Sequence, residues 1–275
     1  MFAQDPGTST RQVSSTVGVS HQSVWRVLRH NLLYPYHMQR VQALSPADYP
    51  SRIMFCEWYL QRCIEPTFQQ RVFFIDEAIF TRDAIVNFHN NHQWADVNPH
   101  AITQSRHQQQ FSWNVWAGII GDYLIGPVFL PPRLNAPNYR NFLENELPPL
   151  LEDIPLGTRQ QLWFMHDGAP AHFSLTAREF LNQHYPGRWI GRGGPTAWPP
   201  RSPDLNPLDF FVWGYLKSLV YATPVPDRQA LRDRIVDGCN TIRGTPGILE
   251  HVRQSMVRRY GACIAAHGGH FEHLI

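Results

Sequence analysis

Two aspartates follow short apolar runs, and a third lies near the start of a predicted helix. Asp76 comes directly after residues 72–75, Val-Phe-Phe-Ile, and Asp167 comes after residues 162–166, Leu-Trp-Phe-Met-His. Both runs have the length and composition of buried strands. If the two strands are neighbours in one sheet, both carboxylates emerge at the same end of it. Asp209 belongs to the segment 208–221, which we expect to be helical.

Three carboxylates at one end of a sheet would repel one another unless a cation lies between them. Mg²⁺ prefers oxygen ligands and keeps several waters, which leaves room for phosphate oxygens. Two such ions about 4 Å apart can activate a water or a 3′-hydroxyl and stabilise the leaving oxygen. The pattern therefore favours phosphoryl transfer on a nucleic-acid backbone. The spacing alone also fits the alternative that these acids are ordinary turn residues.

The elements expected around the three acids form a mixed α/β arrangement. Two runs of aromatic and branched residues, 111–120 and 123–130, flank Gly121-Asp122 and predict a hairpin. With the run before Asp76 and the two hairpin strands counted first, the expected order along the chain is three strands, a helix, a strand, a helix, a brief strand and a helix. This order differs from that of an alternating doubly wound fold. The predicted helices cover 45–63, 137–151, 173–184 and 208–221, the brief strand is Trp189-Ile190, and further helices run from 227 to the end.

Composition limits the class of protein. The chain has 275 residues, 43% of them hydrophobic, which is enough to bury a core and excludes a disordered or fibrous protein. No run of 18 or more apolar residues occurs and the first residues are polar, so we expect an intracellular protein without a membrane span or secretory signal. The four cysteines form no CxxC pair, which argues against a zinc ribbon and a disulfide scaffold.

The first 45 residues are more basic than the rest. The whole chain carries a net charge of only +2, but this head has four arginines against one aspartate, and the remainder has 20 basic and 21 acidic residues. Apolar residues at helical spacing, Gly18 as a helix end and Ser20 as an N-cap predict a helix-turn-helix, although any short helical hairpin would show the same pattern. The residues expected to contact DNA are His21, Gln22, Ser23, Arg26 and Arg29.

Three segments carry a resemblance to a known family. They are FIDEAIF (74–80), MHDGAPAH (165–172) and WPPRSPDLNPLDFF (198–211). Together they resemble the signature blocks of the mariner-like transposases of the Tc/mariner superfamily, which use DDE/D chemistry. The head resembles the second of that family's two helix-turn-helix units, so the resemblance implies a chain that is incomplete at its N-terminus.

The resemblance implies an RNase H-like mixed sheet flanked by helices, preceded by a partial helix-turn-helix. Residues 1–34 would form the partial DNA-binding unit, 35–70 a linker and leading helix, and 71–275 the catalytic domain. Asp76, Asp167 and Asp209 fall on the catalytic acids, which would hold two Mg²⁺ or Mn²⁺ ions. Asp204 is the rival for the third position, but in the family it belongs to the turn before the last helix. Glu77, adjacent to Asp76 on a strand, would point to the opposite face.

The implied activity is metal-dependent DNA cleavage and strand transfer at transposon terminal inverted repeats. Double-stranded DNA would be the partner, and the family implies a homodimer in the nucleus; with one lysine, Lys217, the chain shows no lysine-rich nuclear signal. One alternative is a catalytically decayed or domesticated DNA-binding protein. Another is a nuclease acting on RNA·DNA hybrids, which the helix-turn-helix disfavours. Forty-one residues separate Asp167 from Asp209, more than in the best-known mariner branches, and this leaves the branch open.

Three further features have two interpretations each. Cys263, His267, His270 and His273 in the C-terminal segment have a spacing that could hold a metal ion. Gly268-Gly269 would break a helix between these ligands, so we expect an ordinary surface. The two histidines that flank Asp167 could contact a phosphate or order the loop, and we favour the second. The polar segment 87–110 resembles the family's dimer-bridging loop and equally fits a surface loop. The two histidines are His166 and His172.

Overall fold

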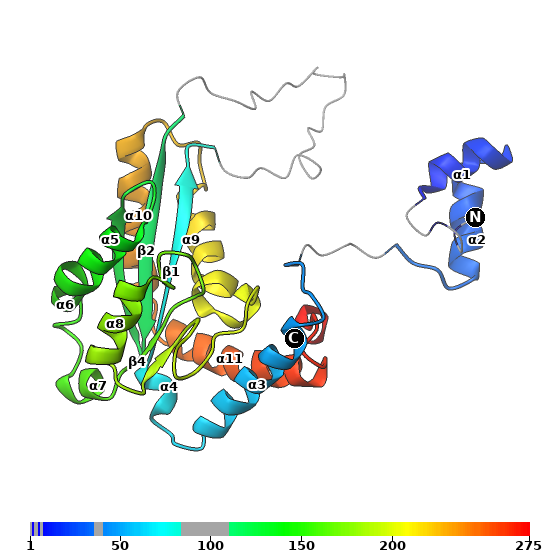
Figure 1. Ribbon diagram of the computed structural model, residues 1–275. Helices are drawn as coiled ribbons and strands as arrows, with labels where there is room; N and C mark the ends of the chain where they lie inside the picture. Colours follow the sequence, from blue (N-terminus) through cyan, green and yellow to red (C-terminus); the bar gives the residue numbers. More distant parts are fainter. Residues whose placement is uncertain (1, 3–4, 6–7, 36–40, 84–109) are drawn as a thin grey trace. The chain divides into compact units, whose positions relative to one another are not determined.

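The computed structural model describes residues 2, 5, 8–35, 41–83 and 110–275 (Figure 1). The chain separates into two compact units, residues 1–41 and 42–275, each described here by itself. None of the helices in the described part is both long enough and apolar enough to cross a membrane.

The first unit contains the predicted pair of helices, α1 (Thr10–Val17) and α2 (His21–His30). The Ser9 hydroxyl accepts a hydrogen bond from the backbone N–H of Gln12 and caps α1, and Gly18 ends α1 with a φ of 75°. Ser20 caps α2 in the same way, by accepting from the backbone N–H of Ser23 at 3.1 Å. The helices and the cap expected from the sequence are therefore confirmed.

The second unit is built on a five-stranded mixed sheet in the order β3-β2-β1-β4-β5. The long strands β1 and β2 and the strands β2 and β3 pair antiparallel, whereas β4 pairs parallel with both β1 and β5. This is the mixed sheet that the order of elements predicted. The strands are β1 (Val72–Thr81), β2 (Ser112–Ile120), β3 (Tyr123–Leu130), β4 (Trp163–Met165) and β5 (Trp189–Ile190).

Helices cover both faces of the sheet, because successive side chains of β1 point to opposite faces. Phe73 and Ile75 pack in one buried cluster with α5 and α8, and Phe74 and Ala78 pack in the other with α3, α9, α10 and α11. Figure 1 shows α5, α6 and α8 on one side of the sheet and α9 on the other. The helices are α3 (Asp48–Arg62), α4 (Phe68–Arg71), α5 (Ala136–Asn141), α6 (Leu147–Leu150), α7 (Leu156–Gln160), α8 (Leu175–His184), α9 (Trp213–Val220), α10 (Arg228–Gly244) and α11 (Ile248–Ala265).

Two features differ from expectation. Strand β1 runs to Thr81, so Asp76 lies inside the strand and not at its end. It nevertheless lies at an open edge, because β4 pairs with β1 only as far as Phe74 and then ends. The leading helix α3 contributes Phe55 and Tyr59 to the core of the second unit. The predicted boundaries after residues 34 and 70 therefore differ from the division between the compact units, which falls after residue 41.

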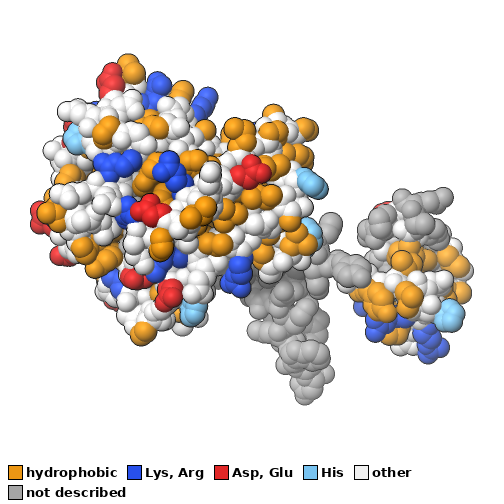
Figure 2. Space-filling model, turned by 90° about the horizontal axis from the view of Figure 1, so that it is seen from below, with side chains coloured by type: hydrophobic (Ala, Val, Ile, Leu, Met, Phe, Trp, Pro, Cys, Tyr) orange, Lys and Arg blue, Asp and Glu red, His pale blue; other side chains and the backbone are white. Residues whose placement is uncertain are grey.

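One face of the second unit agrees with the nearly balanced charge of the chain. On the face shown in Figure 2, Lys and Arg side chains stand in small groups among hydrophobic and uncharged ones and form no continuous basic patch. The global charge therefore gives no indication of where a polyanion would bind, and such a site has to be found from local contacts.

Candidate active site

The three predicted acids line one open cleft of about 470 Å³. Asp76 comes from the middle of β1, Asp167 from the loop after β4, and Asp209 from η4 (Leu208–Val212), the π-helical turn that leads into α9. Because β1 and β4 are parallel neighbours, Asp76 and Asp167 both lie just beyond the last paired residues of β4, at the same end of this strand pair, as the sequence predicted. The cleft is also lined by Glu77, Arg201, Ser202 and Asn206.

Asp76 is half-buried and accepts a hydrogen bond from the indole N–H of Trp213, with 2.8 Å between Nε1 and Oδ2. Its pKa lies well above the ordinary value, first because burial disfavours the charged form and then because Asp209 and Glu77 carry like charges. Trp213 begins α9, one turn after Asp209 in η4, so the continuous helical segment formed by η4 and α9 supplies one acid and orients another. Sequence reasoning missed Trp213, although it belongs to the apolar stretch after the 198–211 block.

Asp209 is the more exposed of the two acids, and it lies close enough to Asp76 for the two carboxyl groups to affect each other's pKa. The walls of the cleft displace water from its carboxyl group, and with the charge of Asp167 this raises its pKa to about 6. The side-chain amide of Asn206 donates to Asp209 Oδ2 at 3.3 Å and favours the charged form. Asp209 in turn raises the pKa of Asp76, so a cation between the two carboxyl groups would favour their charged forms.

Asp167 has different partners. Displacement of water would raise its pKa, but hydrogen bonds from His172 Nδ1 at 2.6 Å and from the backbone N–H of Ala169 at 2.9 Å outweigh this effect and lower the pKa. On its other side the His172 ring places Nε2 at 3.4 Å from Glu77 Oε1. Burial would lower the pKa of His172, but the two carboxylates raise it to about 10, so the imidazolium bridges two acids.

Glu77 agrees with the prediction in one respect and differs in another. It points to the face opposite Asp76, since it contacts His172 whereas Asp76 contacts Trp213. Glu77 still lines the same cleft, because β1 has no neighbour on that edge beyond Phe74. The flanking His166 is fully buried, with Nδ1 at 2.9 Å from the hydroxyl of Tyr139, and burial lowers its pKa. The rings of His166 and His172 stack on each other with their centroids 5.0 Å apart, and this packing favours the loop-ordering role.

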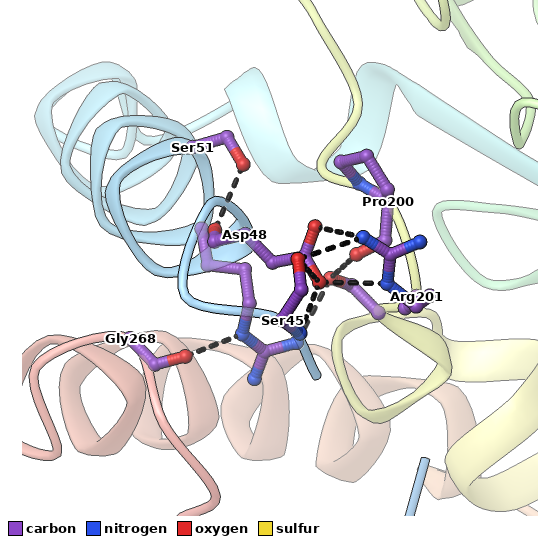
Figure 3. A network of polar contacts seen from close by, with 8 residues as sticks. Ser45, Asp48, Ser51, Pro200, Arg201 and Gly268 are labelled. Carbon is purple, nitrogen blue, oxygen red and sulfur yellow. Dashed lines mark hydrogen bonds and ion pairs between the residues drawn. The ribbon is translucent and has the colours of Figure 1, made fainter. Parts of the chain in front are cut away.

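Asp204, the rival for the third acid, faces away from the cleft and pairs with a fully buried arginine. Arg52 Nη1 and Nη2 lie 2.8 and 2.5 Å from the two carboxylate oxygens of Asp204. Beside them Arg201 makes a matching pair with Asp48, with Nε and Nη2 at 2.7 and 2.5 Å (Figure 3). We call these four residues the α3 clamp, because they join α3 to the turn that precedes η4.

The α3 clamp was not predicted from the sequence. Its signal is a complementary spacing, with Asp48 and Arg52 one helical turn apart and Arg201 and Asp204 three residues apart. Arg52 also donates from Nε to the carbonyl of Gly268 at 2.7 Å, which ties the C-terminal segment to the same point (Figure 3). The hydrogen bond with Arg201 lowers the pKa of Asp48 to about 2. The turn that carries Asn206 and leads into η4, where Asp209 lies, is thus held in place by two ion pairs.

The chemistry of the cleft fits divalent cations, because its donors are carboxylate oxygens and two of them have raised pKa values that a cation would lower. The arrangement brings Asp76 and Asp209 together, while Asp167 is held by His172. Among the described residues, no three His, Cys, Asp or Glu side chains are placed to hold one metal ion together. This also applies to the C-terminal residues, of which Cys263 is buried in α11.

The predicted DNA-contacting residues all lie on α2 in the first unit. His21, Gln22 and Arg26 are exposed, and the Ser23 hydroxyl lies 3.0 Å from that of Ser20. Arg29 is also exposed, but its guanidinium stacks on two rings, 5.1 Å from the centroid of Trp25 and 4.8 Å from that of Tyr34. Of the predicted loop 87–110, all but the last residue lies outside the described residues.

No protein-family model matches the chain. It is 28% identical over 177 residues to the transposable element Tc3 transposase of Caenorhabditis elegans, a match that covers 62% of this chain and 49% of that protein. The chain therefore spans about half the length of this curated relative.

Among solved structures, the mariner Mos1 paired-end complex with Mg has the same fold, with a TM-score of 0.75 and 21% identity over 98% of this chain and 77% of that one. The catalytic domain of Mos1 mariner transposase gives a TM-score of 0.63 with 19% identity, over 85% of this chain and 100% of that one. The chain is therefore similar in sequence to a Tc3 transposase, and it shares the fold of the Mos1 mariner transposase structures.

Proposed function

We propose that the protein is a DNA transposase that cleaves DNA at transposon ends and transfers the cut strand to a target, in a reaction that needs divalent cations. The observation that carries the proposal is the carboxyl pair of Asp76 and Asp209, with raised pKa values, in the same open cleft as Asp167. The related proteins support it, since the curated relative is named a transposase and the Mos1 structures include a strand transfer complex.

Asp76, Asp167 and Asp209 are the residues that would hold two Mg²⁺ or Mn²⁺ ions. Mos1 structures with Mg and with Mn support this choice of metal. When bound, such ions supply an activated water or 3′-hydroxyl and stabilise the leaving oxygen. Here Trp213 orients Asp76, Asn206 orients Asp209, and His172 positions Asp167 from behind. The α3 clamp holds the turn before Asp209 in place.

The DNA partner would be double-stranded terminal inverted repeats and target DNA. In the first unit we assign recognition to His21, Gln22, Ser23, Arg26 and Arg29 on α2, the second helix of a helix-turn-helix. Paired-end complexes of Mos1 support a homodimer that holds two transposon ends. Work on chromosomal DNA would place the protein in the nucleus.

The test is a nicking assay with the full chain on a duplex taken from the ends of the encoding element, with Mg²⁺, Mn²⁺ or EDTA. We expect divalent-dependent nicking that falls by at least about 100-fold in Asp76→Ala and in Asp167→Ala, because positioning and charge stabilisation dominate phosphoryl transfer. Asp237→Ala, which removes an exposed carboxylate on α10, is the matched control.

Metal binding is read separately from activity, by the loss of the free Mn²⁺ signal in electron paramagnetic resonance. Wild-type protein and Asp237→Ala should bind Mn²⁺, and Asp76→Ala should bind it more weakly. Unchanged nicking in both aspartate variants would overturn the site. Sequence-selective DNA binding without nicking would instead favour a non-catalytic DNA-binding derivative of a transposase.

A further inference from the structure

Two arginines converge on one aromatic ring beside the carboxylate cleft. The guanidinium carbon of Arg178, on α8, lies 4.6 Å from the centroid of Phe173, and that of Arg192 lies 4.2 Å from the same centroid. Phe173 directly follows His172, in the loop that carries Asp167. We call Arg178 and Arg192 the arginine pair. None of the roles assigned above uses these two side chains.

The arginine pair adjoins the cleft through Gly168. This glycine follows Asp167 and lines the cleft, and a Cβ added to it would lie 3.5 Å from the Cβ and 3.6 Å from the Cδ of Arg192. The stem of Arg192 therefore packs against the backbone next to Asp167. A ligand that lies along this edge of the cleft can reach the carboxylates and Arg192 together.

Neither guanidinium of the arginine pair has a salt-bridge partner among the described residues. Some other arginines of this unit pair with an acid, as Arg253 does with Asp122 and Arg140 does with Glu144. In the part of the chain that the structure describes, the side chains of Arg178 and Arg192 make neither an ion pair nor a hydrogen bond, and the Nε of Arg178 is buried without an acceptor. Two like charges on one ring without an acid are suited to an anion.

The loop after β5 is shaped to hold this arrangement. Gly193 has a φ of 76°, and a Cβ there would lie 3.1 Å from the ring of Phe173 and 3.5 Å from the Cδ of Arg178. A side chain at this position would be strained and would press on the ring and the guanidinium stem. The loop belongs to the long interval between Asp167 and Asp209, and it carries Arg192.

We propose that the arginine pair binds the phosphodiester backbone of the DNA strand that enters the carboxylate cleft. Guanidinium groups match phosphate oxygens in a bidentate geometry, and their stacking on Phe173 limits the freedom they lose on binding. Each contact neutralises one phosphate beside the carboxylates. This inference rests on the proposed transposase function, since it names where that site holds its substrate.

The experiment measures how salt weakens DNA binding by the full chain, using fluorescence anisotropy of a labelled duplex in EDTA, where no cleavage occurs. Each lost phosphate contact lowers the slope of log K against log salt concentration by about 0.9. We expect that reduction in Arg178→Ala and in Arg192→Ala, and twice as much in the double variant. Arg192→Lys should keep the slope, because it keeps the charge.

Arg232→Ala is the matched control, since Arg232 also stacks on a ring, 4.7 Å from the centroid of Phe129, and is exposed on α10. Its slope should equal that of the wild type. Melting temperatures of all variants report whether the fold is kept, and Arg192→Gln provides a second test if Arg178→Ala unfolds. Slopes of the arginine-pair variants equal to that of Arg232→Ala would overturn the proposal, whereas a wild type that binds no DNA would overturn the proposed function itself.

Discussion

The cleft and the α3 clamp both contain aspartates withdrawn from water, and they treat them in opposite ways. In the clamp, Asp48 and Asp204 each face a guanidinium, and the pKa of Asp48 falls to about 2. In the cleft, Asp76 and Asp209 face each other, and both pKa values rise. Only four residues separate Asp204 from Asp209. The clamp carboxylates are neutralised by arginines of the chain itself. In the cleft, a bound cation would relieve the repulsion between Asp76 and Asp209.

The largest effect on stability should come from breaking the buried pair of the clamp. Asp204→Asn leaves the fully buried Arg52 without its carboxylate, and we expect the free energy of unfolding to fall by about 3 kcal/mol. Urea denaturation with Asp237→Asn as control measures it. The double variant Arg52→Met/Asp204→Leu should lose less than Asp204→Asn, because no charge is left buried. A single variant as stable as the control would show that the pair does not support the turn.

The same substitution in the cleft should have the opposite sign. Asp76→Asn removes the like-charge contact with Asp209 but keeps an oxygen that can accept from Trp213, so in EDTA we expect the free energy of unfolding to rise by roughly 1 kcal/mol. Mg²⁺ should raise the melting temperature of the wild type and leave that of Asp76→Asn unchanged. If Asp76→Asn is less stable than the wild type in EDTA, the contrast between cleft and clamp is wrong.

The smallest effect should be the pH dependence of the outer clamp pair, because the Arg201 side chain is 45% exposed and solvent screens it. The pKa of Asp48 is lowered from 3.8 to about 2 in the folded protein. Its stabilisation is therefore present above pH 3.8 and is lost as the pH falls through that range towards 2. Asp48→Asn should flatten the fall in stability over this window, as followed by circular dichroism. Acid unfolding curves that coincide with those of Asp237→Asn would contradict the assignment.

Local patterns in the sequence were enough to predict most elements, because periodicity and capping act within a few residues. The hairpin around Gly121-Asp122, the capped helix after Ser20 and the helix that begins near Asp209 all appear where expected. The extent of β1 was not predictable in this way. Its length to Thr81 depends on pairing with β2, and the exposure of Asp76 depends on where β4 stops.

The family signature blocks placed three acids near one another, and the structure confirms that Asp76, Asp167 and Asp209 line one cleft. Their charge states depend on partners that lie far away in the sequence or on another element. Asp76 has Trp213, 137 residues on, and Asp204 has Arg52, 152 residues before it. A sequence pattern gives no distance between such positions.

The sequence by itself determined where most strands and helices lie, which three aspartates are candidates for phosphoryl-transfer chemistry, and the two capped helices of the basic head. These depend on residue type and on spacing along one element. Only the tertiary structure decided which acids carry a compensating arginine, which two raise their pKa values by lying together in a cleft, and that Arg178 and Arg192 meet on Phe173. The physical reason is that charge compensation falls off over a few ångströms in space, and chain separation alone does not fix those distances.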